Sequence, residues 1–161
     1  QNIWRDSKNF TTCVADIEQL PFSKNQFDLV VSSGALSYGD NRKVMTEIYR
    51  VLKDGGKFIC VDSLNHNLIY RFNRFIHYLR GNRSKTTLQS MPTLQLLEQY
   101  HQYFGNIELK FFGSLTWLMP LITKITNENL AKIISDMFDR IFFVKKSSFK
   151  FVMVAHKKNI K

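Results

Sequence analysis

The residues whose types best suit chemistry are a histidine and two arginines in the middle of the chain. Arg71 and Arg74 are three residues apart, a spacing that places both on one face of a helix. Guanidinium groups bind phosphate and carboxylate groups well. His66, a few residues upstream, is the best-placed candidate for a catalytic base. The pattern predicts a site for an anionic substrate. Two simpler interpretations stay open, namely a solvated basic helix face and a structural hydrogen bond from His66.

An aspartate and a group of small residues stand where two predicted strands end. Asp16 follows a β-rich run at residues 11–15, and Ser32, Ser33 and Gly34 close the next apolar run. In an open α/β sheet, ligands bind beyond the carboxyl ends of the strands, so these are candidate binding residues. Asp is also a common turn-capping residue, and Ser and Gly suit a tight loop for steric reasons alone.

The first part of the chain predicts buried parallel strands and one helix. Apolar runs of strand length lie at residues 11–15, 27–32 and 57–61. The second run is apolar throughout, which indicates burial on both faces of the sheet. Asp40 is the predicted N-cap of a helix over residues 42–52, which Asp54, Gly55 and Gly56 are expected to end.

After Ser63 the apolar residues recur with the period of helices. Helices are predicted at 67–80, 93–103 and 127–143, strands at 107–112 and 149–155, and a basic polar loop at 81–87. The first of these helices has an apolar stripe, which is assigned to the core. It consists of Leu68, Phe72, Phe75, Ile76 and Leu79. The cations of that helix would then lie on the opposite face.

The order of these motifs resembles the core of class I S-adenosylmethionine-dependent methyltransferases, in particular the type 11-like group. The family pattern is D-x-x-x-L-P-F, then F-D-x-V, then L-K-x-G-G, and it is matched between roughly residues 10 and 63. The segment from Asn65 to Arg80 resembles, more loosely, the cap of methyltransferases that act in bacterial polysaccharide biosynthesis. The resemblance implies an α/β fold with a Rossmann-like sheet, mostly parallel with an antiparallel edge, and an inserted helical cap.

The resemblance also implies a division of the chain. Residues 1–63 would form the C-terminal part of the cofactor-binding core, residues 64–92 the cap, and residues 93–161 the rest of the core with a helical insertion at about 113–146. The family's glycine loop is missing, because no G-x-G pattern occurs among the seven glycines. We therefore expect an N-terminally truncated chain that lacks the first strands, with about 60–80 residues upstream. A complete small fold is the alternative. The 161-residue chain alone should bind the cofactor weakly or not at all.

The family's binding residues can be carried over to matching positions. The resemblance implies that Asp16 accepts a hydrogen bond from the adenine amino group of S-adenosylmethionine and that Ile17 packs on the ring. Ser32, Ser33 and Gly34 would lie beside the methionine part of the cofactor. Tyr38 stands with Ser37 where many relatives have two histidines, and it is a candidate substrate contact.

Charge and cysteine usage restrict the classes of binding partner and the cellular compartment. Residues 1–63 hold eight basic and eight acidic residues and residues 64–161 hold fifteen and five, so the second part carries the whole net charge of +10. Such a surface suits anionic partners. Cys13 and Cys60 lie in apolar strand patterns and are expected to be buried, reduced thiols of a cytoplasmic protein. The histidines and cysteines lack the spacing of metal ligands, so no metal site is expected.

Three functions follow as hypotheses. The first is methyl transfer from S-adenosylmethionine to a hydroxyl of a small or carrier-linked anionic substrate such as a sugar. The second is methyl transfer to a quinol-like lipid. The third is a non-catalytic basic module that binds a membrane surface or nucleic acid. Nucleic acid is the less favoured partner because no common RNA-binding motif is present. Peripheral contact with the inner face of the membrane is compatible with each of them.

Overall fold

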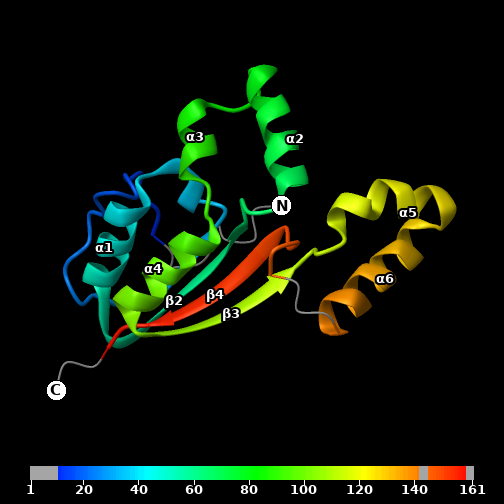
Figure 1. Cartoon of the computed structure of the whole chain (residues 1–161). Helices are drawn as coiled ribbons and strands as arrows, with labels where there is room; N and C mark the ends of the chain where they lie inside the picture. The colour runs from blue at the N-terminus through cyan, green and yellow to red at the C-terminus, as the bar shows by residue number, and fades with distance from the viewer. Residues whose placement is uncertain (1–10, 142–144, 159–161) are drawn as a thin grey trace.

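The computed structural model describes residues 11–141 and 145–158, and in this part of the chain four strands form one sheet (Figure 1). The strands are β1 (Phe27–Ser33), β2 (Leu52–Ser63), β3 (Asn106–Phe112) and β4 (Lys150–His156), in the spatial order β1-β2-β4-β3. β1 and β2 are parallel, whereas β4 runs antiparallel to both β2 and β3. The predicted antiparallel edge is confirmed, and the described sheet is mixed rather than mostly parallel.

Two helices cover one face of this sheet. α1 (Asn41–Val51) and α4 (Leu94–Phe104) lie side by side on that face (Figure 1). Alternate side chains of β2 and β4 pack against these helices and form the core. The largest fully buried side chains of the core include Phe58 and Phe151 from the strands and Ile48, Tyr100 and Phe104 from the helices. The first helix begins as predicted, because the Asp40 carboxylate accepts a hydrogen bond from the amide of Arg42 at 2.9 Å.

The junction of α1 with β2 differs from the prediction. The helix ends at Val51, and Leu52 is already part of β2. Phe27 pairs with Leu52 but Leu29 pairs with Lys57, so the extra residues of β2 bulge out between these two pairs. The Asp54-Gly55-Gly56 segment is therefore a bulge inside the strand and not the end of the helix.

The predicted first strand is absent from the described residues. Residues 11–15 form no strand, and Asp16 instead makes a single bridge with Gln19. Cys13 is exposed and Cys60 is buried in β2, so the expectation of two buried thiols is wrong for Cys13. In the described chain β1 is an edge strand, and no strand lies against its outer side.

β1 is also less buried than its apolar sequence predicts. Val30 packs against the core, but Leu29 and Val31 point to the other face and are exposed. In the described chain, helices pack against only one face of the sheet here, so the prediction of burial on both faces is wrong.

Two further helices rise from the carboxyl end of β2 and return to α4 (Figure 1). α2 (Leu68–Leu79) matches the predicted helix, and α3 (Lys85–Ser90) occupies part of the predicted loop. The apolar stripe of α2 is not core: Leu68, Phe72, Phe75 and Leu79 are exposed, whereas Tyr70 and Arg74 are buried. The prediction of the buried face is wrong because α2 packs on the polar carboxyl end of a strand. Its polar side chains form hydrogen bonds there and are buried in place of the apolar stripe.

A helical arm connects β3 to β4. A 3-10 turn, η2 (Thr116–Leu118), leads into α5 (Met119–Ile125) and then α6 (Glu128–Ile141). The two helices extend away from the sheet beyond the end of β3 (Figure 1). The end of the helix predicted at 127–143 lies partly outside the described residues. Within the described chain, none of the helices combines the length and the hydrophobicity needed to cross a bilayer.

Candidate functional site

The loop after β1 is fixed to the end of β2 by backbone and carboxylate hydrogen bonds. Gly34, in the left-handed region with φ 67°, donates from its amide to the carbonyl of Val61 at 2.9 Å. The Asp62 carboxylate accepts from the amide of Leu36 at 3.1 Å and from that of Ser63 at 2.6 Å. Burial raises the pKa of Asp62. Asp62, which the sequence analysis did not single out, therefore sets the conformation of the loop that carries Ser33 and Gly34.

The turn that carries Asp16 lies beside this loop. The Asp16 carboxylate accepts from the amide of Glu18 at 2.9 Å, which is the turn-capping role left open from the sequence. Glu18 in turn accepts from the amide of Asp40 at 2.7 Å, and this hydrogen bond lowers the pKa of its carboxyl group. Ile17 packs against Gly39, where an added Cβ would lie 3.1 Å from the Ile17 side chain. The structure thus brings the predicted adenine contacts next to the loop after β1.

The Leu20-Pro21-Phe22 motif is held by α1. Arg50 donates to the carbonyl oxygens of Leu20 and Phe22 at 3.0 and 2.7 Å, and it pairs with Glu47. Glu47 also accepts from the amide of Leu20 at 2.8 Å. The loop between the Asp16 turn and β1 is therefore anchored by a charged pair that the sequence analysis did not identify.

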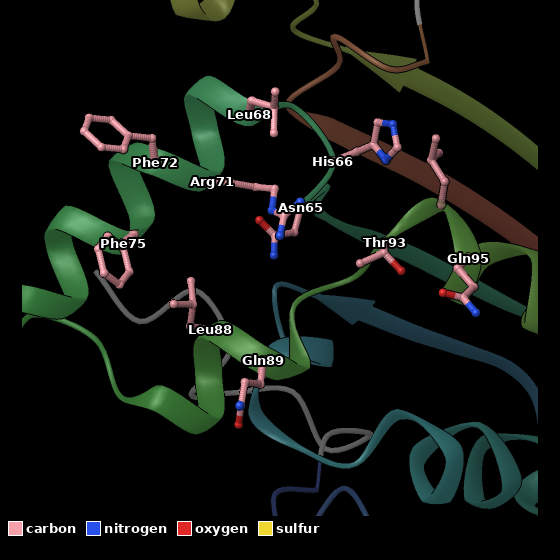
Figure 2. A pocket seen from close by; sticks show the side chains of 11 residues that line it. Asn65, His66, Leu68, Arg71, Phe72, Phe75, Leu88, Gln89, Thr93 and Gln95 are labelled. Atoms are coloured by element: carbon pink, nitrogen blue, oxygen red, sulfur yellow. The ribbon is translucent and has the colours of Figure 1, made fainter.

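A cavity of about 980 Å³ opens where β2 meets the helices α2, α3 and α4 (Figure 2). Its lining residues are Asn65, His66, Leu68, Arg71, Phe72, Phe75, Leu88, Gln89, Thr93, Leu94 and Gln95. Phe75 of α2 faces Leu88 of α3 across the cavity, and Arg71 extends toward Asn65 (Figure 2). The cavity therefore has an apolar wall and a polar side at the carboxyl end of a central strand.

The two arginines of α2 have different surroundings. Arg71 is exposed and lines the cavity together with His66. Arg74 is 4% exposed, and its Nη1 donates to the carbonyl of Leu64 at 2.9 Å and to Asn65 Oδ1 at 3.1 Å. Burial lowers the pKa of the Arg74 guanidinium to about 10, and nearby Arg83 acts in the same direction. Arg74 thus fastens α2 to the end of β2, and the structure does not place it beside Arg71 in the cavity.

The remaining predicted site residues lie outside the cavity lining. Tyr38, in the 3-10 turn η1 (Leu36–Tyr38), is 75% exposed and does not line the cavity. Ser33 is exposed at the end of β1, and Ser32 is half-buried opposite Cys60. A Cβ at Gly34 would meet nothing within 4 Å, so the space beside its backbone is open to a ligand.

Part of the cavity was not anticipated from the sequence. The sequence pattern places Phe72 and Phe75 in the core, and it predicts no role for Leu88 and Gln89. One signal was available for these last two residues: Ser84 precedes α3, and its hydroxyl accepts from the amide of Thr87 at 3.1 Å, as an N-cap does.

These residues are compatible with S-adenosylmethionine at the carboxyl ends of the strands. A carboxylate has more acceptor positions than the one turn hydrogen bond of Asp16 uses, so it can also accept from an adenine amino group. The open space at Gly34 would admit the methionine part of the cofactor. In the described residues, no group of three or more potential ligands suits a metal ion.

Comparison with known proteins finds methyltransferases. Residues 1–60 match the Methyltransf_11 family model, a methyltransferase domain. A methyltransferase from Haloferax volcanii, solved with its activator Trm112, superposes on 98% of this chain and 65% of its own with a TM-score of 0.62 at 17% identity. A phosphoethanolamine N-methyltransferase from Haemonchus contortus, solved with S-adenosylhomocysteine, covers 90% of this chain and 36% of its own with a TM-score of 0.52 at 18% identity. The chain has the Rossmann-like fold of class I methyltransferases, as the sequence resemblance predicted.

The curated relatives include quinone-modifying enzymes. The ubiquinone/menaquinone C-methyltransferase UbiE of Rickettsia prowazekii is 35% identical over 74 residues, which is 44% of this chain and 30% of that protein. The demethylmenaquinone methyltransferase of Oceanobacillus iheyensis is 31% identical over 99 residues, or 57% of this chain and 41% of that protein. The chain thus spans less than half of the length of these relatives. The looser resemblance to polysaccharide enzymes stays a prediction.

Proposed function

We propose that the protein transfers a methyl group from S-adenosylmethionine to an amphipathic acceptor bound in the cavity between α2, α3 and α4. The observation that carries this proposal is the position of the cavity. It opens at the carboxyl end of β2, to which the loop after β1 is hydrogen-bonded. At about 980 Å³ it is large enough for a small molecule. A cytoplasmic location, expected from the cysteine usage, is part of the same proposal.

In this reaction the main role of the protein is to position the acceptor against the methyl group of the cofactor. The cofactor supplies a methyl group activated by a sulfonium, so an acceptor atom forms one bond to carbon while the carbon–sulfur bond breaks. The cavity residues align the acceptor and exclude water. His66 is the candidate to take the proton that the acceptor loses, because its imidazole lines the polar side of the cavity.

The first candidate acceptor is a quinol-like lipid. Leu68, Phe72, Phe75 and Leu88 offer an apolar wall that suits a ring with a hydrocarbon tail. The named activities of the Rickettsia and Oceanobacillus relatives support the same class of substrate.

The second candidate acceptor is a hydroxyl of an anionic or carrier-linked sugar. The polar side of the cavity favours it, because Gln89, Thr93 and Gln95 can hydrogen-bond hydroxyl groups and Arg71 can bind a phosphate or carboxylate.

Methyl-labelled S-adenosylmethionine and the full-length protein test both candidates. We expect label transfer to a short-chain demethylated quinol, and we expect Phe75→Ala with Leu88→Ala to raise its KM about tenfold or more through lost apolar contact. Phe112→Ala is the matched control, since Phe112 is an exposed aromatic outside the cavity. Label transfer to an anionic glycolipid alone, with KM sensitive to Arg71→Gln and not to the apolar variant, would favour the sugar. No transfer to either class would contradict the proposal.

A further inference from the structure

The helical arm formed by α5 and α6 exposes a row of large apolar side chains. The exposed residues are Leu121, Ile125, Leu130, Ile133, Ile134, Met137 and Ile141. Their exposed fractions run from 37% for Ile134 to 79% for Ile125. A continuous exposed apolar surface of this extent is uncommon on a monomeric soluble protein, and it indicates an interaction surface for another protein or a membrane.

On α6 the exposed apolar residues form one solvent-exposed stripe. Leu130, Ile133, Met137 and Ile141 follow one another at helical spacings of three and four residues. Ala131, off this stripe, is fully buried. The stripe is therefore a continuous outer surface of the arm.

The arm has a fixed attachment to the sheet. The carboxylate of Asp139 accepts from the amides of Gly113 and Ser114 at 2.6 and 3.0 Å, just beyond the end of β3. The hydroxyl of buried Tyr70 donates to the carbonyl of Gly113 at 3.2 Å, which links the same loop to α2. These contacts hold the apolar stripe in a defined direction.

Basic residues accompany the apolar surface. They are Lys124, Lys132, Arg140, Lys145 and Lys146, and all of them are exposed. The acidic residues of the same segment are Glu128, Asp136 and Asp139, and Asp139 is already engaged by two amides. Trp117, a residue type that favours membrane–water interfaces, is partly exposed at the start of the arm.

We propose that this arm docks on an anionic lipid surface, with the apolar stripe of α6 and the end of α5 inserted at the headgroup level. α6 is an exposed amphipathic helix with a continuous apolar face, which is the physical character of a helix that lies in the membrane interface. The segment from 117 to 146 carries five basic and three acidic residues, and this excess of positive charge suits anionic headgroups. The proposal goes beyond methyl transfer and does not depend on it.

Vesicle flotation of the full-length protein tests this docking. We expect binding to mixed phosphatidylcholine–phosphatidylglycerol vesicles, weaker binding at high salt, and little binding to pure phosphatidylcholine. Ile133→Ser with Met137→Ser should weaken the partition about tenfold or more. Lys124→Gln with Lys132→Gln should weaken it about fivefold per charge removed.

Two controls separate docking from misfolding and from general charge. Val14→Ser removes an exposed apolar side chain and Lys24→Gln an exposed charge, both outside the arm, so both should bind as the wild type does. Circular dichroism should show the same helix content in every variant, because the changed side chains are exposed. Absence of vesicle binding, or arm variants that bind like the wild type, would overturn the proposal. A wild-type dimer that the Ile133/Met137 variant abolishes in lipid-free solution would overturn it too and assign the arm to a second copy.

Discussion

At the scale of single residues, the two arginines of α2 lie in different environments, one exposed and one buried. Their spacing predicts equal roles, yet Arg71 lines the cavity and Arg74 is buried against the carbonyl of Leu64. A helical spacing of three places two side chains within about 60° of each other around the axis. Because α2 packs against the end of β2, this angle is enough to bury Arg74 and leave Arg71 exposed.

The difference gives a matched pair of variants. Arg71→Gln should leave the free energy of unfolding within about 0.5 kcal/mol of the wild type. It should raise the KM of an anionic acceptor about tenfold or more, the effect of one lost ionic hydrogen bond. Arg74→Gln should lower the free energy of unfolding by about 1–3 kcal/mol, because it leaves a buried carbonyl without its donor. Urea unfolding and steady-state kinetics decide between these outcomes, and a reversed pattern would show that the two roles are exchanged.

Asp62 makes a residue-scale prediction about pH. Burial raises its pKa in the folded protein above the ordinary value of 3.8, so the folded state binds the proton more tightly than the unfolded state does. Unfolding therefore releases protons in the window between the two pKa values. The contribution of Asp62 to stability should fall as the pH rises through that window.

The Asp62→Asn variant isolates this contribution, because an amide does not titrate. The free energy of unfolding of the wild type minus that of the variant should decrease as the pH rises above 3.8. Urea unfolding at a series of pH values measures the difference. A difference that grows with pH would mean that the amides of Leu36 and Ser63 outweigh burial and lower the pKa of this carboxyl group.

At the scale of elements, the helices were predictable in position and less so in orientation. The Asp40 cap and the apolar period predicted the start of α1, and α4 ends at Phe104, one residue beyond its predicted end, with Gly105 at φ 84° as its C-cap. The apolar stripe of α2 was assigned to the core and is exposed instead. Periodicity identifies a helix and its apolar face, but it does not say which face turns inward when polar partners are available at the base.

The attachment of the arm yields an element-scale prediction. Asp139→Ala removes the acceptor for the amides of Gly113 and Ser114, and we expect faster amide hydrogen exchange across residues 113–126 with little change in β2. Mass spectrometry of hydrogen exchange measures both segments. Asp136→Ala is the control, since Asp136 is an exposed carboxylate on the same helix. Equal protection in the two variants would show that α5 and α6 are held by other contacts.

At the scale of the whole molecule, the sequence motifs located the strands of the sheet better than the cavity. The pattern F-D-x-V and the segment Lys57 to Val61 correctly marked two adjacent parallel strands. The run at 11–15 has the composition of a strand but no neighbour to pair with in the described chain, so composition alone misled. The cavity needs α2, α3 and α4 together, and contacts between distant segments leave no local pattern in a sequence.

The proposed function requires that the protein binds S-adenosylmethionine, and titration calorimetry of the full-length protein measures this binding. We predict saturable binding that Asp16→Ala weakens by about 1–3 kcal/mol, the effect of a lost hydrogen bond to a charged group. Asp28→Ala should leave the affinity unchanged, because Asp28 is an exposed carboxylate paired with Lys53. Absence of saturable binding by the folded full-length protein would contradict a role in methyl transfer from S-adenosylmethionine.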